Sequence, residues 1–282
     1  MNPKNVTYKE MKNIQIKDMQ SKSIVIDIYR SFSTPFTWFF VRLGVSPNFI
    51  TISSYFLCII GGFILSLGTY ISFLFGILPF VLFRIFDDSD GEVARIQNKK
   101  SIEGLFFDSL GHYIYNFFIG LGLGIGLYKL YGGIWYMVIG LFFGFMFILQ
   151  DIARDTIKLL IRQIIINHKI RKTSQNEEGL YNHFEQRFNR TIYNEHKWEK
   201  GKAFSKIFGV YPFQGVIFSD RIVIIILFIL FLIEFFTNSL GFSIGDNISL
   251  SLIYITAVII SKFLWLMYIL LRITDKRPFT DL

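Results

Sequence analysis

The stretch RIFDDSDGEVARIQNKKSIEGLFFDSLGH, residues 84–112, separates two apolar segments that are each long enough to enter or cross a bilayer. It carries Asp87, Asp90, Asp108 and His112 at helical spacing. Ionisable groups at membrane depth are costly and normally mark a transport path or a catalytic site. The stretch is therefore the first candidate for the functional site.

The composition is typical of a membrane protein. The 282 residues are 52% hydrophobic and 18% aromatic, and only 18% of them are charged. The formal charge of +8 comes from basic residues that are spread over several loops. Because they form no compact basic domain, we predict no nucleic-acid partner and assign the positive charge to membrane topology and anionic lipid headgroups.

The hydropathy pattern predicts an all-α integral membrane protein with six transmembrane helices. A basic and aromatic N-terminal segment precedes them and is typical of an amphipathic helix that lies in the membrane interface. The predicted spans are Phe49–Tyr70, Ile71–Phe86, Gly104–Tyr128, Gly132–Ile166, Phe218–Phe236 and Ile248–Ile273.

These spans divide the chain into a cytosolic or interfacial N-terminal segment, the first four transmembrane helices with the active site, a polar cytosolic loop, and the last two transmembrane helices with a cytosolic tail. The corresponding ranges are 1–46, 47–166, 167–205 and 206–282. Lys and Arg concentrate in the cytosolic regions, whereas the opposite connections contain only Lys129. The positive-inside rule thus predicts a multi-pass protein of the cell membrane with both termini and the Asp-rich stretch on the cytosolic side.

The spacing of the acidic residues predicts a two-helix site. Asp87 and Asp90 are three positions apart, and Asp108 and His112 are four positions apart, so each pair shares one face of its helix. Two facing helices would then present three carboxylates and an imidazole towards a common point near the cytosolic boundary.

The residues alone allow two interpretations of how the negative charge of these acids is neutralised. Arg84 and Arg95 could neutralise the acids in a structural ion-pair network. With Asp88 there are four close carboxylates, so two arginines would leave an excess of negative charge. Oxygen-ligated divalent cations such as Mg²⁺, Mn²⁺ or Ca²⁺ resolve that excess, and we favour them.

The pattern resembles the signature of the CDP-alcohol phosphotransferase (CDP-alcohol phosphatidyltransferase) family, D-x2-D-G-x2-A-R-x8-G-x3-D-x3-D. Every specified position but the last is matched, by Asp87, Asp90, Gly91, Ala94, Arg95, Gly104 and Asp108. The Ser-Pro-Asn-x2-Thr start of the first span at 46–51 and the pair Asp220-Arg221 before the fifth span are weaker similarities.

The resemblance implies a membrane transferase of phospholipid biosynthesis. Such an enzyme cleaves a CDP-linked alcohol, commonly CDP-diacylglycerol, transfers the phosphoryl-alcohol group to an acceptor hydroxyl and releases CMP. Its expected partners are the donor lipid, the hydroxyl acceptor, membrane lipids and, because related proteins are commonly dimers, a second copy of the chain.

The same resemblance assigns roles to residues. Mg²⁺ or Mn²⁺ is the implied cofactor, with Asp87, Asp90, Asp108 and His112 at the four metal positions. The residues implied to shape or line the nucleotide site are Asp90, Gly91, Ala94, Arg95 and Gly104. The implied catalytic residues are Asp108 and His112.

His112 stands where the family has its last Asp, which helps to bind metal and serves as the base for the acceptor hydroxyl. An imidazole can accept a proton near neutral pH or ligate a metal. Three interpretations stay open: His112 is the base, it marks a changed acceptor or metal, or the site has lost turnover. A silent family member that binds CDP-lipid and a cation transporter that uses the intramembrane acids are the alternatives to the enzyme.

Outside the signature, Glu234 near the far end of the fifth span is expected to reach the outer interface. Asp151 and Asp155 flank Arg154 on the fourth helix. We interpret them as interfacial charges in preference to residues of an acceptor pocket.

Overall fold

A computed structural model describes residues 24–99, 101–172, 219–239 and 249–274, and all regular structure in them is helical. Six helices are long and apolar enough to cross a membrane, which confirms the predicted all-α multi-pass architecture. The chain forms two compact units, one made of residues 1–148 and 219–259 and the other of residues 149–218 and 260–282. The Asp-rich stretch lies in the first unit.

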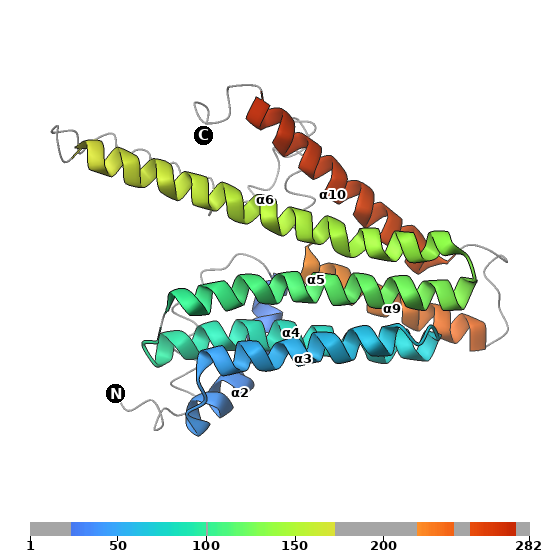
Figure 1. The fold of residues 1–282 in the computed structure, drawn as a ribbon. Coiled ribbons are helices and arrows are strands. Elements are labelled where there is room, and N and C mark those ends of the chain that lie inside the picture. Colours follow the sequence, from blue (N-terminus) through green and yellow to red (C-terminus); the bar gives the residue numbers. More distant parts are fainter. Residues whose placement is uncertain (1–23, 100, 173–218, 240–248, 275–282) are drawn as a thin grey trace. The chain divides into compact units, whose positions relative to one another are not determined.

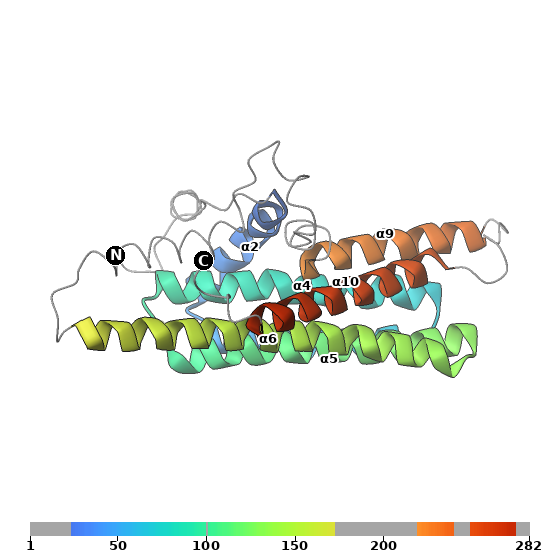
Figure 2. The same ribbon diagram turned by 90° about the horizontal axis from the view of Figure 1, so that it is seen from above.

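The helices are α2 (Ile24–Leu43), α3 (Pro47–Leu65), α4 (Tyr70–Ile96), α5 (Ile102–Tyr131), α6 (Ile134–Lys172), α9 (Asp220–Ser239) and α10 (Leu250–Thr274). In the first unit, α3 packs against both α4 and α5, and α4 also contacts α2 and α9. Figure 1 shows α3, α4 and α5 side by side. Figure 2 shows α2 running obliquely to α4.

A short turn separates the first two membrane helices. Gly68 has φ +74°, a left-handed conformation that favours glycine. Thr69 then caps α4: its side chain accepts from the Ser72 N–H at 3.1 Å, while the Ser72 hydroxyl accepts from the Thr69 N–H at 2.9 Å. The first span therefore ends at Leu65 and the predicted end at Tyr70 is wrong, because a hydropathy average passes over a turn as short as residues 66–69.

The Asp-rich stretch is helical on both sides of its turn. α4 does not end at Phe86 but continues to Ile96, so it carries the first half of the signature as a helix. α5 begins after Ser101, whose hydroxyl accepts from the Gly104 N–H at 3.0 Å. The signature thus occupies the last turns of one membrane helix and the first turns of the next.

Glycines hold α5 between two neighbouring helices. A Cβ atom on Gly122 would lie 2.6 Å from the carbonyl oxygen of Gly62 on α3. A Cβ atom on Gly120 would lie 2.7 Å from the Cα of Gly144 on α6. Small residues let helix backbones approach closely in a membrane, where apolar burial does not drive association. The start of α5, which carries part of the signature, is anchored by these contacts further along the helix.

Glu234 is buried, which differs from the expectation of a side chain that extends towards water at the interface. Its residue is only 6% exposed, and its carboxylate accepts from the Ser251 N–H and from the Ser249 hydroxyl, both at 2.8 Å. These donors lie at the beginning of α10, where the helix dipole favours a negative charge. Glu234 therefore links α9 to the start of α10.

The described part of the second unit continues α6 and α10. On α6, Arg154 pairs with Asp151 at 2.8 Å and lies 3.8 Å from Asp155. These contacts join residues of a single helix turn.

Candidate functional site

Side chains of α4 and α5 converge in the Asp-rich stretch. Asp87, Asp108 and His112 each offer one ligand atom, and these atoms all lie within 4.8 Å of one another. The Oδ1 atom of Asp87 is 3.8 Å from Nε2 of His112, and the carboxylates of Asp87 and Asp108 lie within hydrogen-bonding reach of each other. Carboxylate oxygens at such separations suit a divalent cation.

Asp90 lies beside this cluster and is oriented by α3. Asp90 is 7% exposed, and its Oδ2 atom accepts a hydrogen bond from the Thr51 hydroxyl at 2.5 Å. Asp87 and Asp108 are close enough for their charges to act on it. The structure therefore brings Asp90 near the other acids but not into the group of three whose ligand atoms converge.

Replacing Thr51 by Val should weaken cation binding, because the change keeps the shape of the side chain and removes the hydroxyl that orients Asp90. Loss of such a supporting hydrogen bond typically costs about 10–100-fold in metal affinity, and we expect a weakening in that range. Titration of the purified protein with Mn²⁺ measures it. Thr256→Val is the matched control, because this threonine is exposed on α10 and its hydroxyl donates only to Leu252 O in the described residues. An affinity equal to that of the wild type would show that Thr51 does not support the site.

Arg84 is a buried cation next to the cluster. The residue is 2% exposed, and its guanidinium lies 4.3 Å from the ring centre of Tyr115. Its Nη1 donates to Nδ1 of His112 at 2.8 Å and lies 3.6 Å from Oδ2 of Asp87. Because a guanidinium can only donate, Nδ1 is the unprotonated nitrogen of His112. The ring proton is therefore on Nε2, which faces Asp87.

Asp88 has its own positive partner on another helix. Its Oδ1 atom accepts from Nη2 of Arg221 on α9 at 2.6 Å. The Arg221 guanidinium also lies 5.3 Å from the ring centre of Tyr29, whose hydroxyl donates to the Arg221 carbonyl at 3.3 Å. Burial raises the pKa of Tyr29 above its ordinary value, although the positive charges of Arg84 and Arg221 act in the opposite direction. Asp88 is thus part of an ion pair between α4 and α9.

Glu92 is a buried residue of the signature helix that was not predicted from the sequence. It is 5% exposed, and its carboxylate accepts from the Thr37 hydroxyl at 2.5 Å and from the Ser33 hydroxyl at 3.3 Å. Ser33 and Thr37 are one turn apart on α2, so their hydroxyls share one face of that helix. This spacing is the signal in the sequence that could have indicated the contact with Glu92. Glu92 fixes α2 to the helix that carries the signature.

The positions predicted for the nucleotide have little side-chain bulk around them. A Cβ atom on Gly91 would meet only Nη1 of Arg95, at 3.5 Å, among the described residues. A Cβ atom on Gly104 would lie 3.4 Å from both Asn48 Oδ1 and Ser101 Oγ. Arg95 is exposed, whereas Gly91, Ala94 and Gly104 are partly exposed. This surface therefore combines open space with polar atoms.

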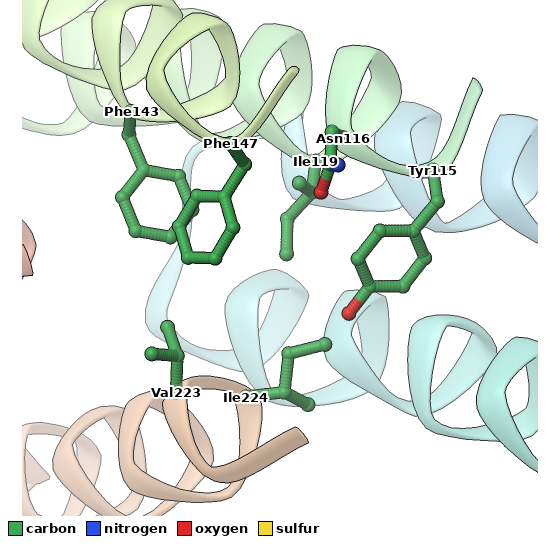
Figure 3. A pocket seen from close by; sticks show the side chains of 7 residues that line it. All are labelled: Tyr115, Asn116, Ile119, Phe143, Phe147, Val223 and Ile224. Carbon is green, nitrogen blue, oxygen red and sulfur yellow. The ribbon is translucent and has the colours of Figure 1, made fainter. Parts of the chain in front are cut away.

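A hollow lies one turn beyond His112 along α5, between α5, α6 and α9 (Figure 3). Its lining consists of Tyr115, Asn116, Ile119, Phe143, Phe147, Val223 and Ile224. The space inside it that a water molecule could occupy is only about 10 Å³, far below the roughly 300 Å³ at which ordinary ligand pockets begin. The hollow is therefore too small for a nucleotide.

The family model of the CDP-alcohol phosphatidyltransferases matches residues 44–180. Members of this family are typically dependent on divalent cations, and the acidic cluster lies within the matched residues. The comparison with curated proteins found no significant match.

Proposed function

Because residues 44–180 belong to the CDP-alcohol phosphatidyltransferase family, we propose that the protein transfers the phosphoryl-alcohol group of CDP-diacylglycerol to an acceptor hydroxyl and releases CMP. The observation that carries this proposal is the convergence of Asp87, Asp108 and His112, in which the carboxylates of Asp87 and Asp108 offer oxygen ligands. The six apolar helices suit an enzyme whose donor and product are lipids. The reaction would belong to phospholipid biosynthesis and take place at the cytosolic face of the cell membrane.

The donor set of the cluster fits a divalent cation. Asp87 and Asp108 offer carboxylate oxygens, and Asp90 adds a third carboxyl group nearby. Oxygen ligands favour Mg²⁺, with Mn²⁺ as the alternative. When bound, such a cation neutralises the pyrophosphate of the donor and stabilises the leaving CMP.

The remaining chemistry falls to side chains of the chain itself. The acceptor oxygen attacks the phosphorus of the phosphoryl-alcohol group in line with the bond to CMP. That P–O bond breaks, CMP keeps the electron pair, and the hydroxyl proton passes to a carboxylate. We assign this proton to Asp108, because Nδ1 of His112 accepts from Arg84 and its Nε2 already carries a proton.

The nucleotide would lie on the open surface formed by the end of α4 and the start of α5. Gly91, Ala94 and Gly104 leave room for it. The exposed guanidinium of Arg95, close to Gly91, can pair with a phosphate of the CDP group. This arrangement gives each matched residue of the signature a physical role.

Release of CMP tests the proposal directly. The purified protein is mixed with micelles that contain CDP-diacylglycerol, Mg²⁺ or Mn²⁺ and a panel of acceptors such as glycerol 3-phosphate, inositol phosphate and serine. We expect CMP to appear only with an acceptor and a cation, and to disappear with a chelator. If a folded, cation-binding preparation releases no CMP with any CDP-linked alcohol, the enzyme assignment is overturned.

The same purified protein distinguishes the enzyme from its two alternatives, a silent family member and a cation transporter. A silent family member would bind CDP-diacylglycerol without releasing CMP. A cation transporter would move Mn²⁺ across liposomes without nucleotide. The buried Glu234 does not support a cation path, because its carboxylate is engaged at the start of α10.

A further inference from the structure

We propose, building on the proposed function, that Arg84 and His112 together take the place of a second metal ion, so that the site binds a single divalent cation. Many phosphoryl-transfer sites hold two cations about 4 Å apart. In this chain, the contacts between α4 and α5 place a fixed guanidinium and a proton-bearing nitrogen beside the carboxylates.

The charges of the cluster match one divalent ion. When they are ionised around a bound cation, Asp87, Asp90 and Asp108 would contribute three negative charges, and Arg84 contributes one positive charge. His112 is neutral, because its Nδ1 accepts a hydrogen bond from Arg84. That net charge of minus two would be balanced by one divalent cation, whereas two such cations would leave the partly buried site with a charge of plus two.

The other acids of the signature helix have partners outside the cluster. Asp88 is paired with Arg221 of α9 at 2.6 Å. Glu92 accepts hydrogen bonds from hydroxyls of α2, among them that of Thr37 at 2.5 Å. These two carboxylates therefore do not enlarge the charge that a metal has to neutralise.

Arg84 is held in its place. It is 2% exposed, it stacks on the ring of Tyr115 at 4.3 Å, and its Nη1 atom is shared between His112 at 2.8 Å and Asp87 at 3.6 Å. A guanidinium does not lose its charge under physiological conditions. A second divalent ion near Asp87 would therefore face a positive charge a few ångströms away in a medium that screens it poorly.

Compared with an Asp at the same position, His112 supplies neither a metal ligand nor a negative charge. Its Nε2 atom carries the ring proton and lies 3.8 Å from Oδ1 of Asp87. A nitrogen that carries a proton has no lone pair for a metal. While the contact with Arg84 persists, Asp87 and Asp108 remain as the ligands of the converging group, and Arg84 acts as a positioning residue that fixes the tautomer of His112.

Titration with Mn²⁺ tests this proposal independently of catalysis. The full-length protein is purified, freed of metal by a chelator and titrated while free Mn²⁺ is followed by electron paramagnetic resonance. We expect one tight equivalent per chain for the wild type. Arg84→Met and His112→Asp each make the cluster more negative by one charge, so each should still bind one equivalent with an affinity that is higher by about tenfold or more.

The double variant Arg84→Met/His112→Asp should bind a second equivalent, because the net charge then reaches minus four. Arg154→Gln is the matched control, because it removes an arginine that pairs with a carboxylate on a different helix, α6. It should leave both the stoichiometry and the affinity of Mn²⁺ binding unchanged. If the double variant binds only one equivalent, Arg84 and His112 do not exclude the second ion and the proposal is overturned.

The wild-type stoichiometry alone is decisive if a variant fails to fold. Two equivalents of similar affinity in the wild type would overturn the single-cation site and leave the proposed transfer intact, since CMP release is measured separately. An absence of any binding would overturn both the single-cation site and the cation requirement of the proposed function.

Discussion

Asp90→Asn should lower the rate of CMP release by about a thousandfold or more, because a carboxylate close to the cation stabilises transition-state charge by several kcal/mol. The amide has nearly the same size and can still accept a hydrogen bond from Thr51, which lies 2.5 Å from Oδ2 in the native protein. The substitution therefore removes the charge while the packing between α3 and α4 persists. The rate is measured with CDP-diacylglycerol at saturating acceptor and cation.

Glu103→Gln is the control for this experiment. It makes the same change from acid to amide at an exposed position in the first turn of α5, next to Gly104. We expect its rate to stay within about twofold of the wild type, as is usual for surface substitutions. An Asp90→Asn protein that turns over at the wild-type rate would exclude Asp90 from the catalytic machinery.

Gly120→Val should lower the free energy of unfolding by about 3 kcal/mol, at the upper end of the usual cost of overpacking. A Cβ atom at Gly120 would lie 2.7 Å from the Cα of Gly144. The obstacle is the backbone of α6, which cannot rotate aside as a flexible side chain can. Unfolding of the purified protein by increasing denaturant, followed by circular dichroism, measures the change.

Gly133→Ala provides the comparison, because a Cβ atom at Gly133 would meet the ring of Tyr136 at 3.1 Å. A side chain can shift by the small amount required, so we expect a loss below about 1 kcal/mol. If Gly120→Val is as stable as the wild type, α5 and α6 are not packed backbone to backbone at this point.

Much of the architecture could be predicted from the sequence because membrane spans depend on one-dimensional hydropathy. The six helices were predicted in this way, and only their ends differ. The first span was predicted to reach Tyr70, whereas the chain leaves the helix after Leu65 and turns at Gly68. A hydropathy average does not register such a short turn, since strongly apolar residues stand on both sides of it.

The candidate site was predictable to the extent that it depends on spacing within one helix. Asp108 and His112 are one turn apart, which led to the expectation of a shared face, and the structure places both beside Asp87. The contact between Arg84 and His112 was not predicted, because it depends on the rotation of α4 against α5 about their own axes. No periodicity within a single helix contains that information.

Contacts with helices distant in sequence were missed for the same reason. The hydroxyls of Ser33 and Thr37 meet Glu92 because α2 docks on α4. Glu234 was assigned to the interface when its helix was considered alone. Its carboxylate finds a closer set of donors at the start of the following helix, where Ser251 lies.

The ion pair between Asp88 and Arg221 bears on how the protein is made. The two residues are 133 positions apart, so α4 is synthesised long before α9. Until α9 enters the membrane, Asp88 lacks its counter-ion, and burying an unpaired carboxylate would be costly. The nascent chain therefore either keeps this part of α4 in contact with water or carries Asp88 in its protonated form, and the ion pair is completed only when the fifth membrane span arrives.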